Sequence, residues 1–236
     1  MTPSLETVGM GPGVHGIGEY AFGECYNLKT LDISLSKWSE LETISDEAFL
    51  NCRSLTEVVL PANIKSIGDS AFSDCVNLKS IELPENLTSI GQVAFINTPS
   101  LKNIKIPAKV TKLPAGVFRG SGIEWISVPT SVKTIDNGAF EGCGNLSVVY
   151  YGGTEENWNK ITIGEGNEPL TSATIDFLEL IDFGECGDNL TWILYVDGEL
   201  TRVPVTTDML SGADLTKAGT YNNVKVSYNG VQLADN

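Results

Sequence analysis

The chain has 236 residues, of which 42% are hydrophobic and 19% are charged, a composition typical of a folded protein. Its net charge of -15 argues against a nucleic-acid or anionic-membrane partner, because phosphate binding requires clusters of Lys and Arg that are missing from this sequence. No apolar run approaches the roughly 18 residues that span a bilayer, and no secretory signal follows Met1.

One segment, Ile-x-x-x-Ala-Phe, recurs along the first three quarters of the chain. Its clear and degenerate copies begin at Ile17, Ile44, Ile67, Ile90, Leu113 and Ile135. After each copy, an apolar residue opens a short pattern with further apolar residues at i+3 and i+5. These openers are Leu5, Leu28, Leu55, Leu78, Leu101, Ile123, Leu146 and Leu170. Their spacing is 22–24 residues, except for one interval of 27 that reflects an insertion around residues 34–40. Such a period is the signature of a repeat architecture.

A single repeat already predicts its local structure. Ile81 and Leu83 lie two residues apart and share one face of a short strand, while Ser80 and Glu82 face away. The Ile-x-x-x-Ala-Phe segment places Ile and Ala four residues apart, which predicts a short helical turn that buries Ala and Phe. Because one repeat cannot bury its own apolar face, we expect the repeats to stack and to form a parallel sheet.

These residues resemble the BspA-like bacterial leucine-rich repeat family, whose units read Ile-x-x-x-Ala-Phe-x-x-Cys-x-x-Leu-x-x-Ile-x-Leu-Pro. The match covers about residues 5–175, with Thr98 and Ser121 at the Cys position as departures. The resemblance implies a right-handed leucine-rich repeat solenoid over residues 1–175, with a parallel β-sheet on the concave side and short helical turns. About eight strands are expected, with the first and last repeats partial.

The same resemblance implies a secreted or cell-surface bacterial protein, and some relatives are regarded as adhesins. Residues 150–161 resemble the segment that often closes such repeat arrays. Because the chain begins inside a repeat without a polar cap, we expect it to be a fragment whose leader and earlier sequence have been removed.

Residues 176–236 are predicted to form a second, small β module. Residues 190–196 and 199–205 predict a hairpin that turns at Asp197-Gly198, and 223–228 with 231–234 predict a second strand pair. About residues 190–236 resemble a partial bacterial immunoglobulin-like module, which implies a spacer or binding domain. The chain stops where such a module normally has another strand, so we expect it to be truncated or atypical.

Four of the five cysteines share one repeat position, three residues after the Phe. They are Cys25, Cys52, Cys75 and Cys143. This pattern predicts either a metal site or disulfide ladder, or a small apolar residue that fills one position of the core. Thr98 and Ser121 at the same position favour the core interpretation, and Cys186 has no obvious partner.

No motif predicts catalysis, a cofactor or a metal site. The single histidine, His15, is expected in a surface turn, because no motif supplies the nucleophile and acid that a catalytic base needs. The acidic pair Glu155-Glu156 and residues 164–168 could suggest calcium, but no Asp-x-Asp-x-Asp-Gly loop exists, which favours solvated loop charges. We therefore expect a protein that is not an enzyme.

The outward strand positions carry the best binding signal. Most are small or polar, whereas Trp125, Val148 and Tyr150 form one aromatic and apolar patch on adjacent strands. Exposed aromatic residues are typical of protein or glycan contacts. The alternative is that the C-terminal module or a loop covers the patch. Trp38, in the insertion, is a second candidate.

These observations favour a non-enzymatic extracellular or cell-surface binding or adhesion protein, which presents its repeat sheet to a host or neighbouring-cell protein or glycan. The alternative from another class is a structural spacer for a functional domain outside this fragment, and a hydrolase is a remote alternative. A binding protein predicts an open concave patch, whereas a spacer predicts a covered or wholly polar one.

Overall fold

The computed structural model describes residues 5, 6, 8, 14–33 and 40–177, together with the backbone of the strands between residues 191 and 232. The chain divides into two compact units, Met1–Leu178 and Glu179–Asn236. The helices within the described part are short, and none is long and apolar enough to cross a membrane.

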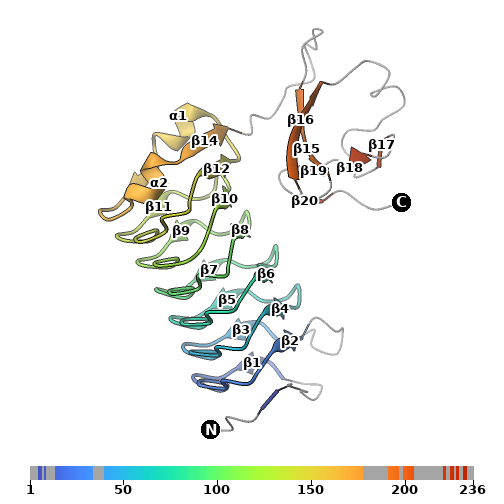
Figure 1. The fold of residues 1–236 in the computed structure, drawn as a ribbon, viewed down its shortest axis with the longest axis vertical. Helices are drawn as coiled ribbons and strands as arrows, with labels where there is room; N and C mark the ends of the chain where they lie inside the picture. The colour runs from blue at the N-terminus through green and yellow to red at the C-terminus, as the bar shows by residue number, and fades with distance from the viewer. Residues whose placement is uncertain are drawn as a thin grey trace. The chain divides into compact units, whose positions relative to one another are not determined.

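The first unit is a β-solenoid in which each repeat contributes one longer strand to a parallel sheet (Figure 1). We call this layer the long-strand sheet. Its members are β2 (Thr30–Asp32), β4 (Glu57–Val59), β6 (Ser80–Glu82), β8 (Asn103–Lys105), β10 (Trp125–Val128), β12 (Val148–Tyr151) and β14 (Thr174–Phe177). They pair in two ladders, β2-β4-β6 and β8-β10-β12-β14, which adjoin between β6 and β8. Residues at equivalent repeat positions pair, as Glu57 does with Ser80 and Trp125 with Val148. The predicted parallel pairing is confirmed, and its register is confirmed for the strand pairs from β2 to β6 and from β8 to β12.

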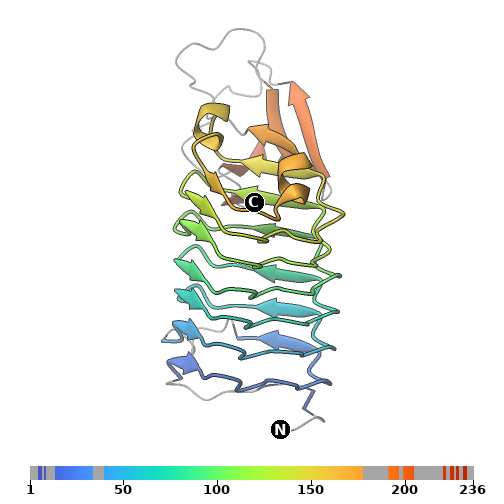
Figure 2. The same cartoon turned by 90° about the vertical axis from the view of Figure 1, so that its left-hand side faces the viewer.

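A second parallel layer of two-residue strands lies on the other side of each coil (Figure 2). Its members are β1 (Gly16–Ile17), β3 (Thr43–Ile44), β5 (Ser66–Ile67), β7 (Ser89–Ile90), β9 (Lys112–Leu113), β11 (Thr134–Ile135) and β13 (Thr162–Ile163). Each of these strands except β13 ends on the apolar residue that opens an Ile-x-x-x-Ala-Phe segment. The solenoid core therefore lies between two sheets.

The prediction of a short helical turn in each Ile-x-x-x-Ala-Phe segment is wrong. These segments are successions of turns; in one of them Glu47 has φ 54°, and Asn51, two residues after its Phe, has φ 60°. A right-handed helix requires negative φ at every residue, so two left-handed residues per repeat prevent one. The backbone N–H groups bond to the next repeat instead: Phe49 donates to the Ala71 carbonyl at 2.8 Å.

Phenylalanine rings form a continuous stack through the core. Successive rings lie 5.2–5.7 Å apart between centroids, and most are nearly parallel. The stack consists of Phe22, Phe49, Phe72, Phe95, Phe118 and Phe140. All but Phe22 are fully buried, because every interior ring has a repeat on both sides. The stack carries the shared core that the repeat period predicts.

Two short helices follow at the C-terminal end of the stack, α1 (Glu155–Trp158) and α2 (Glu168–Ser172). The Thr154 hydroxyl accepts a hydrogen bond from the Asn157 N–H and caps α1, which turns Trp158 onto Tyr151 with ring centroids 5.1 Å apart. Buried Asn167 accepts from the Phe140 N–H at 3.0 Å, where other repeats offer a backbone carbonyl.

The last strand departs from the predicted register. The sequence pattern places Ser172 and Thr174 outward beside Val148 and Tyr150, but Val148 pairs with Thr174 and Tyr150 pairs with Asp176. The reason is that α2 takes up the residues up to Ser172, which moves the strand two positions along the chain.

In the second unit the structure describes backbone pairing only. Strand β15 (Thr191–Val196) pairs antiparallel with β16 (Glu199–Pro204). Two shorter antiparallel pairs are β17 (Thr220–Tyr221) with β18 (Val224–Lys225), and β19 (Ser227–Tyr228) with β20 (Val231–Gln232). The immunoglobulin-like assignment of residues 190–236 and the domain boundary after residue 175 stay predictions.

Candidate functional site

The outward side of the long-strand sheet, which we call the strand face, presents two rows of side chains across the repeats. The first row contains Thr30, Glu57, Ser80, Asn103, Trp125, Val148 and Thr174. The second row contains Val59, Glu82, Lys105, Ser127, Tyr150 and Asp176. Residues between the rows are buried, apart from the half-buried Ile175 on β14, because side chains alternate along each strand.

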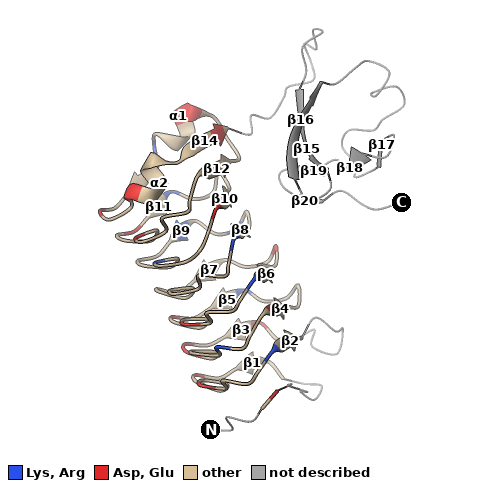
Figure 3. Cartoon of the chain, viewed as in Figure 1, with Lys and Arg blue, Asp and Glu red and all other residues tan. Residues whose placement is uncertain are grey.

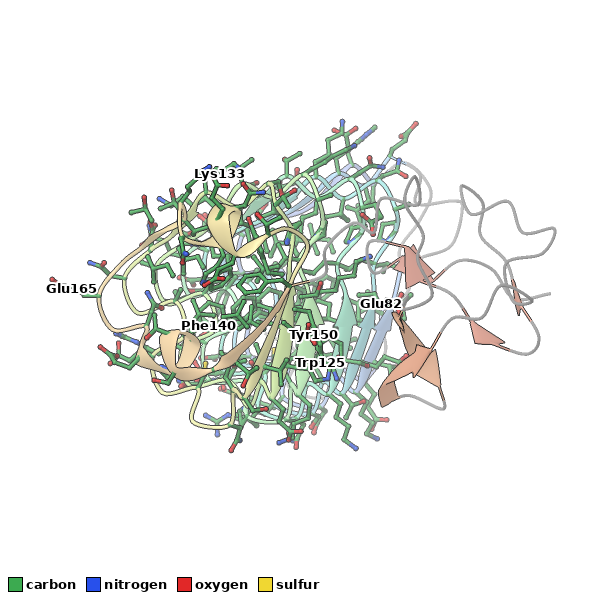
Figure 4. The ribbon with its side chains drawn as sticks, turned by 90° about the horizontal axis from the view of Figure 1, so that it is seen from above. Glu82, Trp125, Lys133, Phe140, Tyr150 and Glu165 are labelled. Carbon is green, nitrogen blue, oxygen red and sulfur yellow. The ribbon has the colours of Figure 1, made fainter. Side chains whose placement is uncertain are left out.

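Trp125 and Tyr150 form an aromatic pair on this face. Their ring centroids lie 5.8 Å apart at an interplanar angle of 74°, an edge-to-face contact between neighbouring strands β10 and β12. Val148 pairs with Trp125 across the same two strands, and Ile126 and Val149 beneath them are fully buried. The structure thus brings the three predicted patch residues together, and all three are half-buried rather than enclosed. Figure 4 shows Trp125 and Tyr150 next to one another on the sheet.

The aromatic pair has polar neighbours that the sequence analysis did not single out. Asn103 lies beside Trp125 on β8, and Ser127 lies beside Tyr150 on β10. Asp176 flanks Tyr150 on its other side because of the displaced register of β14. No local pattern in the sequence reveals that displacement. Trp38, the second candidate, lies outside the described residues.

Charges on the strand face are predominantly acidic. Glu57 and Glu82 are exposed, and Glu82 lies on the same side of the molecule as the aromatic pair (Figure 4). Lys105 stands in the second row, but its ammonium contacts the Glu85 carboxylate at 2.9 Å. Acidic residues also recur along the turns on the opposite side of the coils (Figure 3).

The described cysteines are buried, as the core interpretation predicts. Cys52 Sγ lies 3.1 Å from the Phe22 carbonyl of the preceding repeat, and Cys75 Sγ lies 3.3 Å from the Phe49 carbonyl. Thr98, at the same position, donates instead to the Phe95 carbonyl of its own repeat, at 2.8 Å. This position therefore holds a short side chain that can donate a hydrogen bond, which explains why it is Cys, Thr or Ser in the different repeats.

Burial also makes these thiols poor nucleophiles. Loss of solvation raises the pKa of Cys52 to about 12, and burial raises the pKa of Cys75 well above its ordinary value. The thiolate, which is the reactive form, is accordingly disfavoured at neutral pH. These cysteines have the properties of core residues.

Neither of the other chemical candidates lies in a constellation that performs chemistry. His15 is exposed, and its Nε2 lies 3.3 Å from the Glu40 carboxylate. Glu156 bonds to Lys160 one helical turn later, and this contact lowers the pKa of Glu156. Across residues 14–33 and 40–177, no three His, Cys, Asp or Glu side chains gather as metal ligands.

The repeats match a known family model. The BspA type leucine rich repeat region matches residues 1–41 and 42–162, in six copies. Among curated proteins, none matches the chain.

Solved structures share the fold. The T. pallidum leucine rich repeat protein TpLRR is 28% identical, with a TM-score of 0.56 over 64% of this chain and 67% of that one. A leucine rich cell surface protein from Faecalibacterium prausnitzii is 26% identical, with a TM-score of 0.53 over 67% of this chain and 51% of that one. This chain therefore matches about half the length of the second protein. Two sheets of stacked coils, the phenylalanine stack and the matching repeats together show that the chain belongs to the BspA type leucine rich repeat family.

Proposed function

We propose that this chain is a non-enzymatic binding protein of the bacterial surface or exterior, which presents the strand face to a protein or glycan of another cell. Membership of the family and the similarity to a leucine rich cell surface protein support the location. Adhesion is the physiological role that fits display on a rigid sheet.

The observation that carries the proposal is the edge-to-face pair of Trp125 and Tyr150. Aromatic side chains offer a large contact area at a small cost in conformational entropy, and their polar atoms can still hydrogen bond. The pair lies on a sheet whose outward positions are otherwise mostly polar, so it is a natural anchor. Val148 extends the apolar area, and Asn103 and Ser127 supply hydrogen-bonding groups at its edge.

The second unit has a supporting role in this proposal. We propose that residues 176–236 form a small β module of the immunoglobulin-like type, which acts as a spacer and follows the repeat domain of residues 1–175 in the chain. Its antiparallel strand pairs are compatible with that assignment.

A double variant, Trp125→Ala with Tyr150→Ala, tests the proposal. The full chain is probed against an array of extracellular-matrix proteins and of bacterial and host glycans. We expect the variant to lose at least about tenfold in affinity for the ligand that the wild type binds, because anchor residues commonly contribute that much. Its melting temperature should stay close to that of the wild type.

A matched control removes two aromatic side chains on a turn of the first repeat, Tyr20→Ala with Tyr26→Ala. Tyr26 is the most exposed large apolar side chain of the described part, at 38%. This control should retain binding. Equal loss of binding in both double variants would contradict the strand-face site. A large fall in melting temperature for Trp125→Ala with Tyr150→Ala would show that the patch is covered, and would favour the spacer function.

A further inference from the structure

We infer that the strand face binds a positively charged, extended segment of a partner protein, with Lys or Arg side chains spaced four residues apart. This inference rests on the proposed function, because it names the ligand class for the same surface. Two observations carry it: the distribution of paired and unpaired charges, and the spacing between carboxylates and aromatic rings on the face.

Most basic side chains of the solenoid are already neutralised. The chain carries 30 acidic residues against 15 basic ones. In the described part, the cations held in ion pairs with carboxylates are Lys29, Lys65, Lys102, Lys105, Lys112, Arg119 and Lys160. The charge left for a ligand is therefore negative, and such a surface attracts cationic partners and repels acidic ones.

Two of the uncompensated carboxylates lie on the strand face itself. Glu57 and Glu82 are exposed, and no ion pair among the described residues involves either of them. The cation on the next strand after Glu82 is Lys105, and its ammonium lies 2.9 Å from the Glu85 carboxylate oxygen. A neutral glycan can donate hydrogen bonds to these carboxylates but leaves their charge uncompensated, whereas a Lys or Arg side chain also neutralises it.

Both rows of the strand face place one glutamate and one aromatic ring at the same separation. In the first row Glu57 lies on β4 and Trp125 on β10, and in the second row Glu82 lies on β6 and Tyr150 on β12. The carboxylate and the ring are three strands apart in both rows. At about 4.8 Å per strand, this separation is about 14 Å.

That distance matches an extended peptide laid across the strands. Such a chain rises about 3.3 Å per residue, so four residues span about 13 Å. An even spacing also places both side chains on the same face of the peptide. One cation of the segment then meets the carboxylate, and the other lies against the ring, where a cation–π contact is favourable, most of all with Trp.

The first row is the better track for the peptide. Between Glu57 and Trp125 it presents only Ser80 and Asn103, which are exposed and can bond to a peptide backbone. In the second row, Lys105 stands between Glu82 and Tyr150. We therefore place the segment along the first row, with Glu82 adding to the negative potential beside it.

Three synthetic nonapeptides of Gly, Ser and Thr test the inference against the full chain. One carries two arginines four residues apart, the second carries them three residues apart, and the third carries glutamates at the first spacing. Fluorescence polarisation measures the dissociation constant at low and at moderate salt. We expect the first peptide to bind most tightly, the second to bind several-fold more weakly, and the third not to bind. Binding should weaken with salt, since exposed charges are screened.

A double variant, Glu57→Gln with Glu82→Gln, removes the proposed partners of the cations. Its dissociation constant for the first peptide should rise about twofold to thirtyfold, which corresponds to one or two exposed ion pairs. The matched control is Glu19→Gln with Glu165→Gln, which changes the net charge equally. Glu165 lies on the turn side, away from Trp125 and Tyr150 (Figure 4). The control should stay within about twofold of the wild type.

The outcomes separate this inference from the proposed function. An equal loss in both glutamine variants would overturn the inference, because net charge alone would then explain binding. Failure of the first peptide to bind, or equal binding of all three peptides, would also overturn it. If an array glycan binds and depends on Trp125 and Tyr150 while no arginine peptide binds, the inference fails and the proposed function stands. If array binding is insensitive to Trp125 and Tyr150, the proposed site itself fails.

Discussion

The phenylalanine stack makes a quantitative prediction at Phe72. This ring is fully buried and lies between Phe49 and Phe95, at centroid distances of 5.3 and 5.5 Å and interplanar angles of 6° and 4°. Removing the ring in Phe72→Ala loses about 2–3 kcal/mol of burial free energy. The cavity adds to this cost, because the rigid neighbouring repeats cannot collapse into it. We expect a total loss of about 3–5 kcal/mol.

Phe22→Ala is the matched comparison. Phe22 occupies the same repeat position but is only half-buried and has one stacked phenylalanine, Phe49, at 5.2 Å. Its removal should cost roughly half as much as Phe72→Ala, about 1–3 kcal/mol. Urea unfolding followed by circular dichroism gives both values, provided that the dependence on urea is unchanged. If the two variants lose the same free energy, or if Phe72→Ala is neutral, the shared core does not carry the stability that we assign to it.

Two further predictions concern the buried polar groups of the core. Burial raises the pKa of Cys52 to about 12, so the folded state favours the neutral thiol. The stability that this difference in pKa contributes is fully present below a pH of about 9 and is lost as the pH rises toward 12. Urea titrations should show the free energy of unfolding falling by up to about 1.4 kcal/mol per pH unit for each such thiol. The double variant Cys52→Ser with Cys75→Ser should flatten this dependence on pH. An unchanged slope would argue against buried thiols as its cause. Asn167→Ala should cost about 2–4 kcal/mol, since it removes the acceptor for the Phe140 N–H and two donated hydrogen bonds. Exposed Asn145→Ala should change the free energy of unfolding by less than about 0.5 kcal/mol, and an equal effect of the two variants would refute the role of the Asn167 hydrogen bonds.

The repeat positions predict the long-strand sheet because burial alternates there with a period of two. Ile81 is buried and Ser80 and Glu82 are exposed, as the pattern requires. The same logic places Trp125, Val148 and Tyr150 on one face before any coordinate is known. It does not give the edge-to-face angle of the rings, which depends on side-chain torsions rather than on register.

Features that depend on contacts between repeats escape the sequence pattern. The strand at Thr43–Ile44 has two residues, too few for any periodicity to show. The turn residues Glu47 and Asn51 adopt positive φ although neither is glycine, and they do so because neighbouring repeats bind the N–H groups that a helix would use internally. Asp176 beside Tyr150 follows from the space that α2 occupies, which is a property of the end of the stack.

Because equivalent groups meet at most of the interior interfaces, whole repeats can be duplicated or deleted without redesigning their neighbours. The Lys65–Glu42 pair, for example, joins residues 23 positions apart, which is one unit of the array. An added unit between β6 and β8 would move Glu57 away from Trp125 by one step of about 4.8 Å and leave both ends of the array intact. Distances between binding residues on different repeats therefore change only in whole steps of one repeat. A lineage could retune the spacing of the ligand that it recognises by gene duplication, in discrete increments rather than by gradual substitution.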